Sequence, residues 1–369
     1  MRLSYTLHQN HQAHHSHRTK SSHRSIFRCL SILIAGFMTV LLTGCSNHTA
    51  TGGASNGSKN VITKTINYTV TNGQKAVSHY SQLSPQLDKW INYLNSGADA
   101  IWFTADDGVF DYNVYTRNGK NDITRVVYFS APGSDKKWFT EDDEIASYST
   151  TRFNEVGEWM GEIKYSNPGV DSKWFTPDDI AISHSKGEYN SNGKKTRSMV
   201  SAGAGPDNVW FTADDTAFYA GYSYDAAGNN TRLTHFNGAG KDRLWFTADD
   251  TISSYYAYSY NSKGDLTQQI IYKNAGSNGT WFDDDDTVGN YGNHTYDAHG
   301  KKTRSSFYTG AGTDGIWFTA DDKLISYKTY SYDINGNMTH DVYYTGAGVD
   351  GVWYTADDTI KYENFYKPL

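Results

Sequence analysis

Apolar and polar residues alternate along many short stretches of this chain, and tyrosine is common among the alternating positions. In the stretch TISSYYAYSY, Ile252, Ser254, Tyr256, Tyr258 and Tyr260 fall on one side. Alternation of this kind, rich in aromatic and β-branched residues, predicts a β-strand with one covered face. The stretches TAFYAGYSY and KLISYKTYSY show the same pattern. We therefore expect the same kind of strand at intervals along the chain.

Each predicted strand is followed by a four-residue turn that begins with Asp or Asn and ends with Gly, and then by a second strand. An Asp or Asn side chain can close such a turn on its own backbone, and glycine accepts the positive φ that follows. The second strand often carries a threonine near its start and an aromatic residue near its end. This pattern predicts a β-hairpin with a bulge glycine. The turns are Asn154–Gly157, Asn190–Gly193, Asp225–Gly228, Asn261–Gly264, Asp297–Gly300 and Asp333–Gly336.

A loop that reads G-x-D-x-x-W-F-T-x-D-D, or close to it, separates the hairpins, and we call it the cassette. It occurs eight times, and its tryptophans are 36 residues apart six times and 35 residues apart once. A period this constant indicates one supersecondary unit per repeat, stacked on its neighbours. The tryptophans are Trp102, Trp138, Trp174, Trp210, Trp245, Trp281, Trp317 and Trp353.

These patterns together predict an all-β domain over residues 61–369. Tandem 36-residue β-hairpin repeats would form a curled sheet or β-solenoid, with an eighth hairpin over 62–81 and a last strand over 359–366. The alternative architecture is an eight-bladed β-propeller, in which Trp-Phe-Thr would form a further short strand in each blade.

The segment 82–96, QLSPQLDKWINYLNS, differs from the repeats. Leu87, Trp90, Ile91 and Leu94 would share one face of a helix. We therefore predict a short helical cap insert over the first repeat.

The hairpins resemble the YD repeat of Rhs-like bacterial surface and toxin shells, whose pattern is Y-D-x-x-G-N-x-T followed by an aromatic residue. The best matches are Tyr224–Asn229 and Tyr332–Asn337, and the resemblance covers the hairpin part of each period over 108–345. It implies a cell-envelope protein of bacteria. Two departures stand out: a cassette is inserted in every period, and the chain stops at Leu369, soon after one more strand. We do not expect an encapsulated toxin.

The first 44 residues hold five Lys/Arg, six His and no Asp or Glu, with an apolar run that ends at Gly44. The run is shorter than the roughly 20 residues of a spanning helix, and the layout is typical of a secretory signal. Leu42-Thr43-Gly44-Cys45 resembles the bacterial lipobox, which implies lipidation of Cys45, with palmitate among the attached chains. We expect a lipoprotein signal peptide over 1–44, a flexible tether over 45–60 and an outer-membrane lipoprotein on its periplasmic or surface face. The alternative is an ordinary signal peptide.

Charge and cysteine content narrow the possible partners. Cys29 and Cys45 are the only cysteines, so the repeat domain can contain no disulfide and no cysteine metal site. Without the leader, 28 Lys/Arg stand against 40 Asp/Glu, a net charge of −12. Since no basic residues cluster, we do not expect nucleic acid as a partner.

Three aspartates recur in the cassette, one three residues before the tryptophan and a pair four and five residues after it. The first interpretation is structural: Thr-Ala-Asp-Asp suits a capped type I turn, and the two aromatic residues would pack between hairpins. The alternative is a calcium site, because calcium takes six to eight oxygen ligands. The candidate ligands are Asp207, Asp214, Asp215, Asp242, Asp249, Asp250, Asp314, Asp321, Asp322, Asp350, Asp357 and Asp358.

Paired carboxylates can also hydrolyse glycosides, but that chemistry needs one asymmetric pair with two different pKa values. Eight near-equivalent pairs favour a structural role, so we do not expect an enzyme. The expected function is a lipid-anchored cell-envelope scaffold or binding module, attached to the membrane through Cys45, for a glycan or protein partner. The alternative function is an envelope polysaccharide hydrolase.

Overall fold

The computed structural model describes residues 60–71, 74–83, 88–212 and 214–368. They lie in the second of the two units into which the chain divides, Met1–Ala54 and Ser55–Leu369. The predicted signal peptide, Cys45 and the predicted tether up to residue 59 lie outside the described residues. Within the described ranges, no helix is long and apolar enough to cross a membrane.

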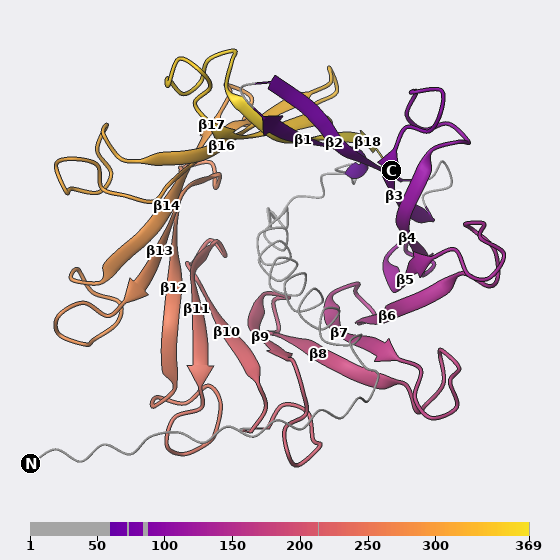
Figure 1. Ribbon diagram of the computed structural model, residues 1–369. Coiled ribbons are helices and arrows are strands. Elements are labelled where there is room, and N and C mark those ends of the chain that lie inside the picture. Colours follow the sequence, from indigo (N-terminus) through magenta and orange to yellow (C-terminus); the bar gives the residue numbers. More distant parts are fainter. Residues whose placement is uncertain (1–59, 72–73, 84–87, 213, 369) are drawn as a thin grey trace, which may run out of the picture. The chain divides into compact units, whose positions relative to one another are not determined.

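In the described residues, eighteen antiparallel strands form one continuous sheet in which each strand pairs with the next along the chain (Figure 1). The strands are β1 (Asn60–Thr71), β2 (Gln74–Leu83), β3 (Lys89–Asn95), β4 (Gly108–Arg117), β5 (Ile123–Ala131), β6 (Glu144–Phe153), β7 (Trp159–Asn167), β8 (Ile180–Tyr189), β9 (Lys195–Ser201), β10 (Ala217–Tyr224), β11 (Asn230–Gly238), β12 (Thr251–Tyr260), β13 (Leu266–Asn274), β14 (Thr287–Tyr296), β15 (Lys302–Tyr308), β16 (Leu324–Tyr332), β17 (Met338–Gly346) and β18 (Thr359–Pro368).

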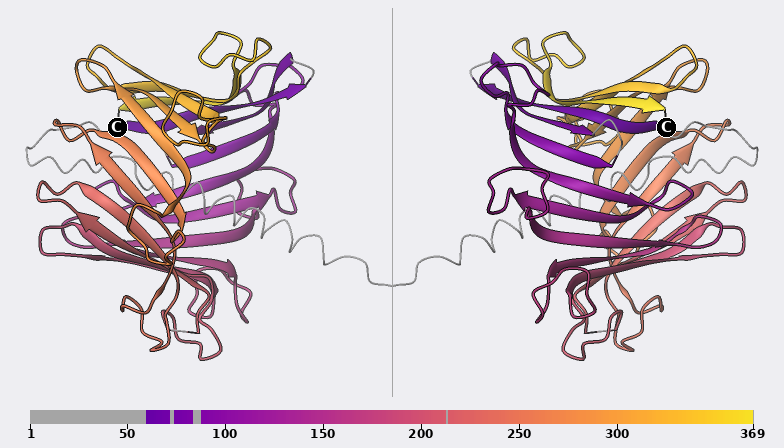
Figure 2. Two further views of the ribbon diagram at one scale, coloured as in Figure 1. Left: turned by 90° about the vertical axis from the view of Figure 1, so that its left-hand side faces the viewer. Right: turned by 90° about the vertical axis from the view of Figure 1, so that its right-hand side faces the viewer.

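The sheet closes on itself because the last strand returns to the first. β1 pairs with β18 from Asn60 opposite Pro368 to Asn67 opposite Tyr362. Figure 2 shows the strands side by side around the resulting ring. The prediction of an all-β curled sheet of hairpin repeats is confirmed. The propeller alternative is wrong, because all described strands share one sheet and do not form separate blades.

The predicted helical cap over 82–96 is wrong where the structure describes that segment. Residues Lys89–Asn95 form strand β3, in which Ile91 lies opposite Gln82 of β2 and Tyr112 of β4. The aromatic and β-branched residues that suited a helix face also suit a strand. The neighbouring strands β2 and β4 select the strand over the helix, because they offer hydrogen-bond partners on both sides. Strand β3 also makes the number of strands even, which a closed antiparallel sheet requires.

The hairpin turns adopt the predicted geometry. In the turn after β10, the Gly228 N–H donates to the Asp225 carbonyl at 3.0 Å, and the Asn229 N–H donates to Asp225 Oδ1 at 2.8 Å. Gly228 has a φ of +82°. The pairing of β10 with β11 shifts register beside Tyr224, as a bulge requires.

In five of the described hairpins, a tyrosine directly before the turn ties the hairpin to the preceding one. The Tyr260 hydroxyl donates to the carbonyl of Asn230 at 2.9 Å, and Tyr296 repeats this bond to Leu266 at 2.8 Å. In this chain the tyrosine of the Tyr-Asp pattern is therefore a connector between strands. Equivalent bonds come from Tyr189, Tyr224 and Tyr332.

A buried ion pair lies near the strand pairing that closes the sheet. Lys328 Nζ lies 3.0 Å from Asp341 Oδ1, and Asp341 is 1 % exposed. The Tyr366 hydroxyl and the Asn364 side-chain amide also donate to the Asp341 carboxylate. These contacts join β16, β17 and β18, because the buried Asp341 carboxylate of β17 has donors from β16 and β18.

Candidate functional site

The cassettes connect each hairpin to the next strand, all at the same end of the strands, and Figure 1 shows these longer connections at the outside of the ring. In the sixth cassette, the Trp281 ring meets the Tyr255 ring edge-on, with centroids 5.9 Å apart. Tyr255 also stacks on Tyr272 at 4.5 Å and contacts Phe282 at 5.0 Å. The two cassette aromatics were predicted to pack between adjacent hairpins, and these contacts place both on the hairpin that precedes the cassette.

The aromatic residue that follows the tryptophan has an unusual backbone conformation. Its φ is positive in every cassette, for example +79° at Phe282 and +73° at Tyr354. A bulky residue rarely adopts this conformation, so the surroundings must stabilise it. The third aspartate does so, since Asp286 Oδ2 accepts the Phe282 N–H at 2.7 Å. The sequence did not indicate this strain.

The first two aspartates of the cassette fold the loop around their carboxylates. In the seventh cassette, Asp314 Oδ1 accepts the N–H of Ile316 at 2.7 Å. Asp321 Oδ2 accepts the N–H groups of Thr313 at 2.6 Å and Asp314 at 3.1 Å, and Asp321 Oδ1 accepts the Thr319 hydroxyl at 2.8 Å. The loop therefore wraps its own N–H groups onto a carboxylate.

The third aspartate joins the loop to the sheet. Asp322 Oδ2 accepts the Phe318 N–H at 2.7 Å and the Tyr291 hydroxyl at 2.6 Å. Asp322 is 6 % exposed, so burial makes these two donors necessary. The Thr319 carbonyl also accepts the Asp322 N–H at 3.4 Å, which closes the predicted turn.

The predicted site residues, apart from Asp250, occupy these three roles in four cassettes. The first role is taken by Asp207, Asp242, Asp314 and Asp350, the second by Asp214, Asp249, Asp321 and Asp357, and the third by Asp215, Asp322 and Asp358. Asp250 accepts the Phe246 N–H of its own loop, but the equivalent tyrosine hydroxyl, that of Tyr219, has no partner. Asp215 is joined to the sheet by strand β9, since the Ser201 hydroxyl donates to Asp215 Oδ2 at 3.0 Å. His184 stands on β8 where other repeats have the donor tyrosine.

Hydrogen bonding sets the protonation of the second aspartate. The Thr319 and Thr313 hydroxyls, and then backbone N–H groups, lower the pKa of Asp321 well below its usual range. The Thr247 hydroxyl and the backbone of Lys241 and Asp242 likewise lower the pKa of Asp249. These carboxylates are therefore ionised at neutral pH.

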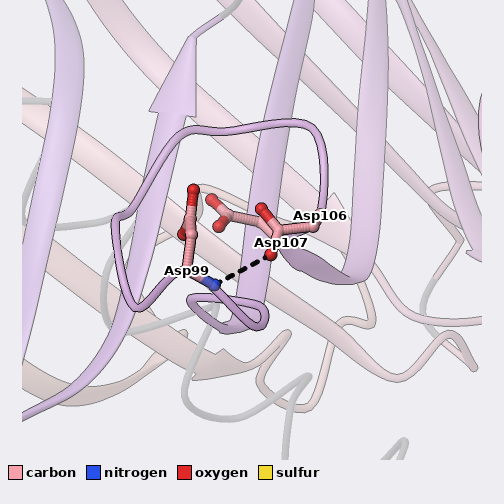
Figure 3. Close-up of side chains that lie close together, drawn as sticks. All are labelled: Asp99, Asp106 and Asp107. Carbon is pink, nitrogen blue, oxygen red and sulfur yellow. Dashed lines mark hydrogen bonds between the residues drawn. The ribbon is translucent and has the colours of Figure 1, made fainter.

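The carboxylates of the first cassette turn toward one another, as Figure 3 shows for Asp99, Asp106 and Asp107. Ligand oxygens of these three residues lie within 4.8 Å of one another, as do those of Asp207, Asp214 and Asp215. Calcium binds carboxylate clusters of this kind. The same oxygens already accept N–H and O–H donors, as Asp106 does from Ala98, Asp99 and Thr104. The cassette therefore supplies its own hydrogen-bond donors to these carboxylates, and calcium binding stays the alternative interpretation.

A cation covers the second cassette aromatic in most repeats. The Arg232 guanidinium carbon lies 3.8 Å from the centroid of the Phe282 ring, and that of Arg304 lies 4.1 Å from the Tyr354 centroid. Arg125, Arg197, Arg232 and Arg304 come from the hairpin before the one that the cassette follows, whereas Lys186, over Phe211, comes from the same hairpin. Cation–π attraction therefore bridges two hairpins at the four cassettes whose cation is an arginine.

Comparison with known proteins gives no family for this chain. No family model and no curated protein matches it. Among solved structures it is similar to a DUF3836 family protein from Bacteroides vulgatus, with 16 % identity over 29 % of this chain and 90 % of that one and a TM-score of 0.21. It is also similar to a porin-like protein from Bacteroides uniformis, with 10 % identity over 84 % of this chain and 98 % of that one and a TM-score of 0.34.

A third similar structure is the TcdB2-TccC3-Cdc42 complex, with 10 % identity over 80 % of this chain and 14 % of that one and a TM-score of 0.25. All three TM-scores are low. The assignment of an all-β repeat sheet therefore rests on the strand pairing of this chain.

Proposed function

We propose that this protein is a lipid-anchored cell-envelope protein of the YD-repeat type, and that its cassettes form a binding module or scaffold. The observation that supports a binding role is a row of half-exposed aromatic side chains at equivalent cassette positions. Their exposed fractions are 43 % for Phe139, 44 % for Phe175, 41 % for Phe282, 47 % for Phe318 and 42 % for Tyr354.

These rings are held rigidly before any partner arrives. The backbone N–H of Phe175 donates to Asp179, the ring packs on Tyr148 at 4.8 Å, and Arg125 lies 5.0 Å from the ring centroid. A ring fixed in this way loses little conformational entropy on binding, which favours affinity. A flat apolar ring next to a cation and hydroxyl groups suits the face of a sugar, so a glycan of the cell envelope is the favoured partner. A protein partner is the alternative.

The anchor is proposed from the lipobox resemblance at Cys45. Labelling of cells with a palmitate analogue should mark the full chain, and Cys45→Ser should abolish the label and leave the leader attached. Equal labelling of the Cys45→Ser variant would contradict a lipid anchor at this residue.

Cosedimentation with isolated cell-wall sacculi tests the binding role. Joint replacement of Phe139, Phe175 and Phe318 by alanine should weaken cosedimentation of the full chain. The matched control replaces the loop residues Val170 and Val349, which are 96 % and 88 % exposed, by alanine. Both variants should show the same circular dichroism as the parent. Unchanged cosedimentation of the triple variant would remove the cassette aromatics from the binding surface.

A further inference from the structure

One repeat differs from the others at the boundary between its cassette and the strand that follows. Asp215 and Tyr219 are four positions apart, whereas Asp250 and Tyr255 are five, which accounts for the single interval of 35 residues. In a regular repeat the extra residue forms a bulge: β11 and β12 shift register beside His235. β10 pairs with β9 without a shift, from Ala217 to Gly221.

The missing residue changes how the strand tyrosine packs. Tyr219 stacks on Trp245 with centroids 3.7 Å apart and planes 12° apart. In five other repeats the corresponding rings meet edge-on, as Tyr327 and Trp353 do at 6.0 Å and 79°. The Tyr219 hydroxyl has no hydrogen-bond partner although Tyr219 is only 1 % exposed, and the Trp245 indole nitrogen is also buried without one. Two buried donors are therefore unpaired at one place, which is costly unless a ligand or water accepts from them.

A pocket opens beside these two rings. Its volume is about 420 Å³, and it lies between the fourth and fifth cassettes. Phe211, Trp245 and Phe246 supply aromatic walls, and Lys186, Glu188 and Arg243 supply charge. The volume suits one sugar ring with its substituents.

The pocket carries more positive than negative groups, in a chain of net charge −7. Glu188 lies 3.9 Å from Lys186 and 3.7 Å from Arg197, so two cations share this carboxylate. Arg197 also lies 4.3 Å from the centroid of the Phe246 ring. Arg243 occupies the loop position that is glycine in the last three cassettes, with a φ of +60°. An anionic ligand is therefore favoured here over a neutral one.

We propose that this pocket binds a carboxylate-bearing sugar residue of a glycan. The aromatic walls stack on the apolar face of the sugar, and Arg243 and Lys186 pair with its carboxylate. Tyr219 and Trp245 also line the pocket, so the indole of Trp245 reports on ligand binding. This inference rests on the proposed function, since it names the ligand class of that binding module.

Titration of the full chain with trigalacturonate, followed by the indole N–H resonances, tests the proposal. The resonance that Trp245→Phe removes should shift, whereas the Trp281 and Trp317 resonances should stay in place. Maltotriose, which has no carboxylate, should bind at least about tenfold more weakly. Absence of a Trp245 shift at millimolar trigalacturonate would overturn the proposal, as would equal affinity for maltotriose.

Two variants separate binding from folding. Arg243→Gly keeps a residue that accepts the positive φ, so it should fold normally and bind trigalacturonate at least about tenfold more weakly. Insertion of one serine between Phe218 and Tyr219 restores the regular repeat and should abolish binding while it preserves or raises the melting temperature. Parental affinity in either folded variant would overturn the proposal. Sacculus binding that depends on Phe139, Phe175 and Phe318 would persist in both, so failure of this site is distinguishable from failure of the proposed function.

Discussion

At the scale of single residues, a tyrosine hydroxyl joins the sheet to the following cassette in five of the described repeats. The Tyr327 hydroxyl donates to Asp358 Oδ2 at 2.6 Å, across 31 residues of sequence. The sequence placed Tyr327 in a strand and Asp358 in a turn, and both placements hold. It could not predict the bond between them, because nothing in a hairpin pattern specifies how far a loop folds back over the strands.

Removal of this hydrogen bond should change the free energy of unfolding by a measurable amount. Tyr327→Phe should lower the free energy of unfolding by about 1–3 kcal/mol, because the buried Asp358 carboxylate loses a donor. Tyr219→Phe is the matched control: its hydroxyl has no partner, so its removal should change stability by less than about 0.5 kcal/mol or stabilise the protein. Urea denaturation of both variants measures the difference. Equal losses would show that the hydroxyl bond contributes nothing.

The pKa values of Asp321 and Tyr327 predict how the stability of the protein depends on pH. Hydrogen bonds from Thr319 and Thr313 lower the pKa of Asp321 in the folded state, so its contribution is present above the unfolded pKa and is lost as pH falls below about 4. Burial, and then the Asp358 carboxylate, raise the pKa of Tyr327. Its contribution is present below the unfolded pKa and is lost as pH rises above about 10. Burial also lowers the pKa of His235 and of His294, the latter to about 4, so stability already declines as pH falls below about 6.5. Melting temperatures should therefore form a plateau from about pH 7 to 9 and fall on both sides. A steep change inside the plateau would contradict this account.

At the scale of elements, the cassette loop depends on one glycine. A Cβ on Gly312 would lie 2.4 Å from the Asp321 carboxylate, and its φ is +63°. Gly315 has a similar φ of +70° but no atom within 4 Å of its Cβ position. Gly315→Ala should cost about 1–2 kcal/mol from backbone strain alone, and Gly312→Ala should cost at least about 1 kcal/mol more. Chemical denaturation of the two variants compares them, and identical costs would mean that the loop does not close tightly on Asp321.

The cassette also determines the response to calcium. Because its carboxylate oxygens already accept backbone and hydroxyl donors, we expect the melting temperature of the full chain to be the same in millimolar calcium and in chelator. Ions that bind only the native state raise stability by mass action. A clear rise with calcium would therefore establish the calcium interpretation of Asp207, Asp214, Asp215 and their counterparts.

The elements were predictable to different degrees, for physical reasons. The alternation of polar and apolar residues and the Asp or Asn and Gly of the turns predict hairpins. The strands and turns around Gly228 and Gly264 could therefore be predicted from local sequence. The segment 89–95 was predicted wrongly as a helix because Trp90 and Ile91 fit either periodicity, and only pairing with β2 and β4 selects the strand. The missing residue before Tyr219 was visible as an interval of 35, but its pocket depends on ring packing that the interval does not specify.

At the scale of the whole molecule, the central feature is closure of the repeat array. The curled sheet follows from the period, but the pairing of β1 with β18 joins segments about 300 residues apart, and periodicity says nothing about such contacts. The buried Lys328–Asp341 pair beside this seam does not recur in the other repeats that the structure describes, so no repeat pattern could have predicted it.

Disulfide trapping across the seam tests closure most directly. Val61 and Lys367 are Cα partners in the β1–β18 pairing, and Ser331 and His340 are Cα partners within the β16–β17 hairpin. With Cys29 and Cys45 replaced by serine, cysteines at Val61 and Lys367 should form an intramolecular disulfide as readily as cysteines at Ser331 and His340, and peptide mass spectrometry after mild oxidation would detect both. A hairpin disulfide that forms while the seam cysteines stay reduced would contradict a closed sheet.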